Sequence, residues 1–250
     1  MKLLFGLLFS FVVISVQSQD IPILFKEAEN LEKQQKEAEA LEKYKELIGL
    51  EPGNIKALVK AAELIISLSS RITDKNGKRL YIETSLSFAK RAIEADSNHA
   101  DANYAMAMAL GKMTDVETEN KKIVELVKEI KRYAEKSLSI NALHAKAHYS
   151  LGKWHYEMVI LPGLKKIAVK LFYGGLPGGD MDSAILHLEK CKSLAPYFVT
   201  NYLDLGKAYK DNHQPGKAIE ILTKMSKLPT RTTDDIASKA EGAKLLASLQ

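Results

Sequence analysis

Two Leu-Gly pairs, Leu151-Gly152 and Leu205-Gly206, constrain the fold of this 250-residue chain more than any other feature. Each pair lies in a stretch that favours helix, and a second such stretch follows it. That second stretch carries an alanine, a leucine four residues later and a proline further on: Ala184, Leu188 and Pro196 after the first pair, and Ala218, Leu222 and Pro229 after the second. Two helices approach closely only where the side chains at their crossing are small. The pattern therefore predicts two helical hairpins, each crossing at a glycine and an alanine.

The second hairpin has the spacing of a tetratricopeptide repeat, which folds as two antiparallel helices. Its large and small residues stand where the repeat requires them: Tyr202, Leu205, Gly206, Tyr209, Ala218 and Leu222. The residues between its helices, 211–216, include asparagine, proline and glycine, which interrupt helices. This hairpin is therefore predicted to be a regular repeat without insertions.

The first hairpin carries an insertion. Gly152 and Ala184 are separated by about twenty residues more than the repeat requires. The insertion contains a segment, 164–173, with an apolar stripe at helical spacing and lysines outside it, and then a glycine-rich segment, 174–179. We expect the amphipathic segment to pack onto the array, where it would shape the groove. Attachment to a membrane surface is the alternative.

Three weaker units precede these two hairpins. In two of them the crossing positions lie about eleven residues further apart than in the repeat, which predicts lengthened helices that turn near Asp74–Lys78 and near Thr114–Glu119. The predicted fold is all-α: a tetratricopeptide-repeat solenoid of about five helical hairpins with lengthened helices, one inserted helix and a C-terminal capping helix. Within one domain, 19–250, the predicted units are about 21–54, 55–99, 100–144, 145–198 and 199–231, with the cap at 232–250.

The first eighteen residues are predicted to form a secretory signal peptide rather than part of the fold. Met1-Lys2 is followed by an apolar stretch, 3–16, and then by small residues suited to cleavage near Ser18. The protein would then be exported, to a periplasm or out of the cell. A membrane anchor is the alternative. The apolar stretch is shorter than the ~20 residues that cross a bilayer, so no stable membrane span is predicted.

Charge and cysteine content argue against two further properties. The formal net charge is +5, but acidic and basic residues are interspersed and the arginines do not cluster, which argues against nucleic-acid binding. Cys191 is the only cysteine, so no disulfide can form within the chain. We expect Cys191 to be a small apolar residue in a helix interface. A thiol that pairs with another chain is the alternative.

No set of residues predicts catalysis or a bound cofactor. No pair of carboxylates stands out as acid and base, and no Ser-His-Asp order is present. The glycine-rich segment 174–179 lacks the Lys-Ser/Thr that follows in a phosphate-binding loop. The chain is therefore predicted not to be an enzyme.

Histidines and aromatic residues gather around the first Leu-Gly pair. His144, His148 and His155 are spaced so that they can share one helix face. No cysteine or carboxylate completes a set of metal ligands, so these rings are predicted to fill packing positions, and no metal is expected. Trp154 and Tyr156 have the chemistry of an aromatic cage, but Trp154 is predicted to pack against the insertion instead.

The run Leu151–Glu157, Leu-Gly-Lys-Trp-His-Tyr-Glu, resembles the tetratricopeptide domain of the regulator of microtubule dynamics family. That family continues with an inserted amphipathic helix ending near an apolar-Phe pair, a repeat helix and a final hairpin ending in Leu-Pro; the similar segments here are Leu171-Phe172, Asp182–Ala195 and Leu228-Pro229. The resemblance implies an all-helical adaptor, associated in animals with microtubules and with membrane contact sites, where the domain is linked to phospholipid binding. A cytoplasmic, microtubule-associated protein is expected only if the signal peptide is not used.

The concave groove of the solenoid is the remaining candidate for a functional surface. In this repeat the first helix of each hairpin presents one face to the groove, at intervals of three and four residues. Here that face is a wall of tyrosine edged by lysine, which suits a partner with acidic groups or an anionic lipid head group. The predicted groove residues are Tyr104, Lys146, Tyr149, Lys153, Tyr156, Leu203, Lys207 and Lys210.

These features predict a non-catalytic adaptor that binds a protein or peptide partner in its groove. A module that binds or transfers phospholipid is one alternative, and a microtubule-associated regulator, as in the resembling family, is the other. An ordinary solvated surface is the alternative for the groove lysines, since lysine is common on exposed helices.

Overall fold

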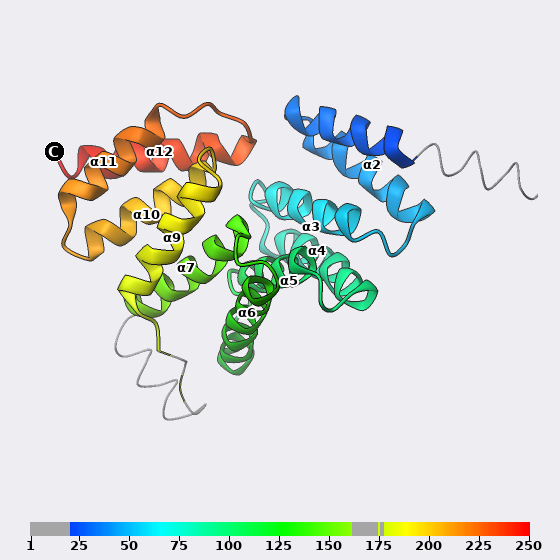
Figure 1. Ribbon diagram of the computed structural model, residues 1–250, viewed down its shortest axis with the longest axis horizontal. Coiled ribbons are helices and arrows are strands. Elements are labelled where there is room, and N and C mark those ends of the chain that lie inside the picture. Colours follow the sequence, from blue (N-terminus) through cyan, green and yellow to red (C-terminus); the bar gives the residue numbers. More distant parts are fainter. Residues whose placement is uncertain (1–20, 162–174, 176–177) are drawn as a thin grey trace, which may run out of the picture.

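The structure is a computed structural model that describes residues 21–161, 175 and 178–250. Over these residues every regular element is a helix, so the predicted all-α class is confirmed. The helices follow one another around an arc whose two ends approach each other (Figure 1). The predicted signal peptide, 1–18, and the predicted amphipathic segment, 164–173, lie outside the described residues.

A helix over residues 21–33 opens the arc. It is followed by α2 (Glu37–Leu50), α3 (Ile55–Ser69), α4 (Lys75–Ala95), α5 (Ala100–Met113), α6 (Asn120–Ile140), α7 (Ala145–Ile160), α9 (Met181–Leu194), α10 (Val199–Asp211), α11 (Pro215–Ser226) and α12 (Thr233–Ala247). Of these described helices, none has both the length and the apolar composition needed to cross a membrane.

The helices pack as successive hairpins. α3 packs on α4, α5 on α6, α7 on α9, and α10 on α11. α12 lies against both α10 and α11, as expected of a cap. Leu245 and Leu246 of its last turn, and Leu249 just after it, pack against a cluster that includes Leu222 and Met225. Without α12, Leu222 and Met225 would face water, at a cost of about 25 cal/mol per Å² of newly exposed apolar surface.

The two Leu-Gly pairs lie at helix crossings, as predicted. A Cβ atom added to Gly152 would lie 2.9 Å from Cγ of Leu188 and 3.1 Å from the carbonyl oxygen of Ala184. A Cβ atom on Gly206 would lie 2.7 Å from the side chain of Leu222. Carbon atoms do not approach this closely without strain, so only glycine allows these helices to come together.

α4 and α6 are each 21 residues long, whereas α5 has 14, which confirms the prediction of lengthened helices. Asp74 caps α4, because its carboxylate accepts a 2.6 Å hydrogen bond from the backbone N–H of Gly77. The added turns have an apolar cluster of their own, formed by Ile66, Ile82, Met113 and Val116. The extra residues therefore add a second apolar cluster beside the main core. The hairpin crossings are unchanged.

Trp154 is buried against α6, while the insertion that it is expected to pack against lies largely outside the described residues. Its indole N–H donates a 2.9 Å hydrogen bond to the carbonyl oxygen of Val127, and the ammonium of Lys131 lies 5.1 Å from the ring centroid. A buried indole needs an acceptor for its N–H, and the preceding hairpin supplies one. Trp154 thus ties α7 to the hairpin before it in the chain.

Candidate functional site

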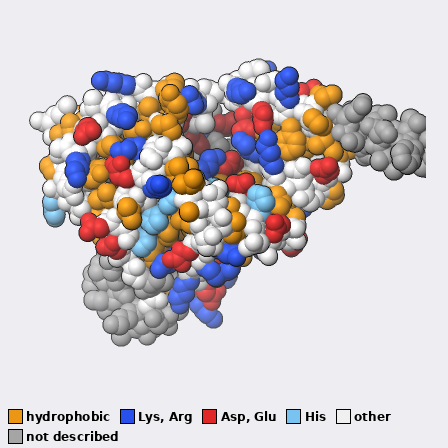
Figure 2. All heavy atoms as spheres, viewed as in Figure 1, with side chains coloured by type: hydrophobic (Ala, Val, Ile, Leu, Met, Phe, Trp, Pro, Cys, Tyr) orange, Lys and Arg blue, Asp and Glu red, His pale blue; other side chains and the backbone are white. Residues whose placement is uncertain are grey.

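The first helices of the hairpins form the inner side of the arc. α3 lies against α5, α5 against α7, and α7 against α10. Acidic and basic side chains lie together near the middle of this side of the molecule (Figure 2). We define the concave face by seven side chains of these helices: Glu63, Tyr104, Lys146, Tyr149, Lys153, Asp204 and Lys207.

Three of the predicted groove residues converge on Asp204 of α10. The hydroxyl of Tyr149 donates a 2.8 Å hydrogen bond to its carboxylate, and Nζ of Lys153 lies 3.2 Å from the same oxygen. Nζ of Lys207 lies 3.7 Å from the other oxygen. Asp204 is only 3 % exposed, so these three groups replace water as its partners. Burial and the carboxylate of Asp204 both raise the pKa of Tyr149, which keeps its hydroxyl a donor.

The two lysines at this site each bridge a second carboxylate. Lys153 is 3.5 Å from Glu157, and Lys207 is 2.7 Å from Glu241 on α12. The five side chains form a row of alternating charge that runs from α7 across α10 to α12. The outer carboxylates are far more exposed than the central one, at 49 % for Glu157 and 58 % for Glu241. The predicted cationic edge is therefore neutralised by carboxylates of the chain itself.

A second site of the same composition lies further along the concave face. Nζ of Lys146 on α7 is 2.6 Å from the carboxylate of Glu63 on α3 and 5.8 Å from the ring centroid of Tyr104 on α5. Burial alone would raise the pKa of Glu63, but the ammonium groups of Lys146 and Lys60 outweigh it and lower that pKa. Both sites thus place a carboxylate beside a tyrosine and a lysine.

Tyr104 and Tyr149 occupy the same position in successive hairpins, since each is the fifth residue of its helix. The repeat therefore places a tyrosine at corresponding points of α5 and α7. Burial, followed by the charge of Glu63, holds the pKa of Tyr104 well above its usual range. The two carboxylates, in contrast, come from helices on opposite sides of this pair, and their positions are not related by the repeat.

The other predicted groove residues lie outside these two sites. The hydroxyl of Tyr156 donates a 2.7 Å hydrogen bond to Asp211, and Nζ of Lys210 lies 3.2 Å from the same carboxylate. Leu203 is 4 % exposed and belongs to the apolar core of the last hairpins. Leu203 packs beneath the concave face, so a direct contact of its side chain with a partner is not favoured.

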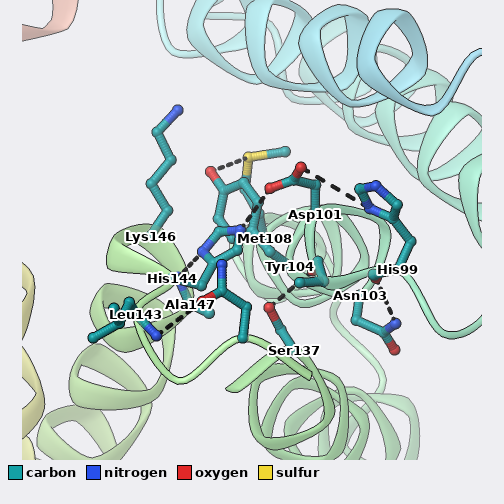
Figure 3. Close-up of polar contacts among 12 residues, drawn as sticks. His99, Asp101, Asn103, Tyr104, Met108, Ser137, Leu143, His144, Lys146 and Ala147 are labelled. Atoms are coloured by element: carbon teal, nitrogen blue, oxygen red, sulfur yellow. Dashed lines mark hydrogen bonds and ion pairs between the residues drawn. The ribbon is translucent and has the colours of Figure 1, made fainter. Parts of the chain in front are cut away.

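A histidine organises the turn before α7. Nδ1 of His144 accepts a 3.0 Å hydrogen bond from the backbone N–H of Ala147, so His144 is the N-cap of α7. Its Nε2–H then faces Asp101 of α5 at 2.8 Å, and this hydrogen bond lowers the pKa of that carboxyl. Figure 3 shows Asp101, Tyr104 and His144 drawn together at the start of α7.

His148 and His155, both in α7, pack on His187 of α9, a residue that the sequence analysis did not single out. Nδ1 of His148 lies 2.8 Å from Nδ1 of His187, and the ring of His155 stacks on that of His187 with 6.1 Å between centroids. The packing role predicted for these rings is thus observed, although His144 lies apart from the other two. In the part of the chain that is described, no group of three or more His, Cys, Asp or Glu side chains is placed to hold a metal ion.

The acidic partners at these sites, Glu63, Asp204 and Asp211, were also missed in the sequence. One signal for Asp204 was present, because it stands between Leu203 and Leu205 in a helix whose residues 201–206 are all buried. An aspartate inside such a stretch must find partners. Which lysine and which tyrosine would reach it depends on how the hairpins are aligned, and the spacing within one hairpin does not encode that alignment.

Comparison with protein families gives one match over most of the chain. The sequence model described as "Regulator of microtubule dynamics protein 1-3" matches residues 24–250. Regulator of microtubule dynamics protein 1 of Bos taurus is 28% identical over 190 residues, which cover 76% of this chain and 59% of the relative. The human protein of the same name is 27% identical over 192 residues, covering 76% and 60%. This chain therefore spans about three-fifths of the length of these relatives.

Solved structures show the same fold at low sequence identity. A thermophilic TPR protein from Thermus thermophilus superposes with a TM-score of 0.64 at 12% identity, covering 91% of this chain and 99% of that one. PilF of Pseudomonas aeruginosa gives a TM-score of 0.52 at 10% identity, covering 93% and 90%. The predicted tetratricopeptide-repeat solenoid is thereby confirmed as the fold.

Proposed function

We propose that this chain, which belongs to the family of the regulator of microtubule dynamics proteins 1-3, is a non-catalytic adaptor that binds a protein or peptide partner along its concave face. The fold supports the adaptor role, because stacked helical repeats present an extended inner surface suited to elongated partners. The partner and the surface that it contacts are our proposal.

The row of alternating charge around Asp204 is the observation that carries this proposal. Removing ionised groups from water is costly, and apolar side chains of similar size would stabilise the fold as well or better. The lysines nevertheless keep part of their surface in solvent: 38 % of the Lys153 side chain and 29 % of Lys207 are exposed. Each can thus exchange one carboxylate of the chain for a carboxylate of a partner. The fixed Tyr149 ring beside them adds contact area at little entropic cost.

The carboxylates on the concave face limit which acidic partners can bind there. The face has no surplus of positive charge, because Glu157 and Glu241 already neutralise the outer sides of the two lysines. A partner gains by placing its own carboxylates where these two exposed side chains now lie. A uniformly acidic partner would meet Asp204 and Glu63 as repulsive groups. We therefore propose a partner segment of mixed charge.

Peptides selected on the immobilised full chain from a random display library would test the proposal. Their affinities, measured by calorimetry, should fall at least about tenfold when Lys153 and Lys207 are both replaced by glutamine, which corresponds to about 1.4 kcal/mol. The matched control replaces Lys128 and Lys190, two exposed lysines on α6 and α9, with glutamine. Equal losses in the two double variants would place binding elsewhere on the chain.

Regulation of microtubules is a second candidate function, favoured by the names of the relatives that the chain matches. Co-sedimentation with polymerised tubulin at moderate salt tests it, and a chain that stays in the supernatant excludes it. The exported location rests on residues 1–18, and the N-terminus of the protein isolated from its source decides it: a chain that begins at Gln19 has been exported. Phospholipid binding stays a prediction, which native mass spectrometry with a delipidated control would test.

A further inference from the structure

The two ends of the described arc are joined by side chains. Ser67 and Ser70 lie at the end of α3, and Asp234 lies in the first turn of α12. The Ser67 hydroxyl is 2.7 Å from one carboxylate oxygen of Asp234, and the Ser70 hydroxyl is 2.9 Å from the other. These contacts link residues from opposite ends of the chain, and Figure 1 shows the start of α12 beside the end of α3. We call these three residues the latch.

Two neighbouring contacts support the same junction. The side-chain amide of Gln35, in the turn before α2, donates a 3.4 Å hydrogen bond to the carbonyl oxygen of Thr230. Arg71 pairs with Glu37, the first residue of α2. Glu37 is also 3.2 Å from the Ser67 hydroxyl, which has only one hydrogen to donate. The shorter contact to Asp234 indicates where the Ser67 hydrogen points, and Arg71 satisfies Glu37. The Ser70 hydroxyl also lies 2.6 Å from the carbonyl oxygen of Ser67, closer than its 2.9 Å contact with Asp234, so Ser67 donates the stronger hydrogen bond of the latch.

The junction is polar, whereas the second half of α12 is held by leucines together with the ion pair between Glu241 and Lys207. The last turns of α12 are held by leucines packed on the core, but Ile236, in its first half, is 58 % exposed. The first turn of α12 is therefore tied to α3 through the contacts of Asp234 with the two serine hydroxyls. Hydrogen bonds between partly exposed groups add little net stability, because water replaces each partner when the bond breaks. Such a junction can open without loss of the hairpins on either side.

We propose that the latch holds the array closed around the concave face and that its release opens this face to a partner. The physical reason is that the curvature of a solenoid is the sum of small rotations between neighbouring repeats. A contact between the first hairpins and α12 fixes the overall curvature. Loss of this contact allows the rotations between the repeats, and hence the curvature, to change. The gating role rests on the proposed function, whereas the closure itself does not.

The distance between the two ends can be measured directly. Nitroxide labels on Ile23→Cys and Ile236→Cys use two exposed positions, one at each end of the arc, while the native Cys191 is buried and stays unlabelled. Double electron–electron resonance should give one well-defined distance in the otherwise unchanged chain. With Asp234→Lys it should lengthen by roughly 5 Å or more, about the rise of one helical turn, and its distribution should broaden.

The control variant is Asp182→Lys. Asp182 and Asp234 are both the second residue of a helix, so the two changes lose the same favourable interaction with a helix N-terminus. Asp182 is exposed, whereas Asp234 contacts Ser67 and Ser70 of α3. Ser70→Asp is a second test variant, because it sets a negative charge against Asp234 at an exposed position. Helical circular dichroism of each variant confirms that the hairpins remain folded.

The outcomes separate the two parts of the proposal. A distance unchanged by both Asp234→Lys and Ser70→Asp overturns the latch. A longer distance together with faster association of the selected peptides supports both closure and gating. A longer distance with unchanged association rates overturns the gating role. If no selected peptide depends on Lys153 and Lys207, the proposed function fails, and the distance still decides the closure.

Discussion

The hydroxyl of Tyr149 on α7 donates a 2.8 Å hydrogen bond to Asp204 on α10, across 55 residues of sequence. The contact joins two successive hairpins at a point where Asp204 is buried and Tyr149 is half-buried. Because Lys153 and Lys207 reach the same carboxylate, one acidic residue fixes the positions of three predicted groove residues. The shape of the concave face therefore depends on Asp204, and the first prediction concerns its removal.

Asp204→Ala should lower the free energy of unfolding by about 2–3 kcal/mol. Removal of one partner from a buried ion pair typically costs ~3–5 kcal/mol, but here Glu157 and Glu241 remain to hold the two lysines. Urea unfolding followed by circular dichroism measures the loss. Asp211→Ala is the control, because Asp211 is 30 % exposed and should cost less than about 1 kcal/mol. Equal losses in the two variants would contradict the central role given to Asp204.

Gly152→Ala should destabilise the chain by about 1–3 kcal/mol, because the new methyl group overlaps Leu188 and the Ala184 carbonyl. Gly111→Ala is the matched control. It lies within a helix too, but nothing lies within 4 Å of an added Cβ. That change should stabilise the chain by up to about 1 kcal/mol, since alanine favours helix over glycine. Thermal unfolding measures both, and shifts of the same sign would show that the crossing is looser than described.

Acid should weaken the contact between α7 and α9. Burial, together with the nearby His148 and His155, lowers the pKa of His187 to about 4, from the 6.5 of a free histidine. The neutral ring is thus favoured by folding. Its contribution is complete above about pH 6.5 and is lost as the pH falls through about 4. After allowance for solvent at this half-buried site, the loss is on the order of 1–2 kcal/mol.

The contribution of His187 can be isolated by comparing the wild type with His187→Phe. The free energy of unfolding of each is measured from pH 7 to pH 4. Their difference should change across that range, because the phenyl ring keeps the packing but has no proton to bind. Fluorescence of Trp154 is a suitable signal, since it is the only tryptophan in the chain and is 3 % exposed. A pH-independent difference would show that His187 titrates normally.

Cys191 should behave as an inert thiol until the chain unfolds. It is fully buried, as expected for a residue in a helix interface, and burial raises its pKa to about 12. The thiolate is the reactive form, so alkylation of the native chain should be at least about a hundredfold slower than in denaturant. Rapid modification of the native protein, or dimers that form on oxidation, would instead favour the alternative of a thiol that pairs between chains.

The hairpins could be predicted from the sequence because their signals are local. Gly152 and Ala184 define a crossing by their size alone, and the extra residues in α4 and α6 appear as a longer interval between small residues. Both signals lie within one hairpin. The partners of the groove lysines could not be predicted in this way. Lys146 reaches Glu63 across 83 residues, from one hairpin to a hairpin two earlier in the chain.

Trp154 shows that a large side chain in a solenoid also packs against the hairpin before its own. The insertion that follows α7 is its neighbour in sequence, but the helix face that carries Trp154 is turned toward α6. Each hairpin packs between the one before it and the one after it, so a large side chain has two possible neighbours. The free N–H of the indole adds a polar requirement, and the carbonyl oxygen of Val127 meets it.

Truncation series are the usual way to find which repeat of an array binds a partner, on the assumption that each cut affects only its own end. The contact between Asp234 and the serines of α3 breaks that assumption here. A fragment that ends at Pro229 lacks α12, which covers the last hairpin. It also lacks Asp234, so the contact with α3 at the other end of the arc is lost as well. Lost binding in such a fragment would not place the partner on α12, so point substitutions are the sounder way to map this protein.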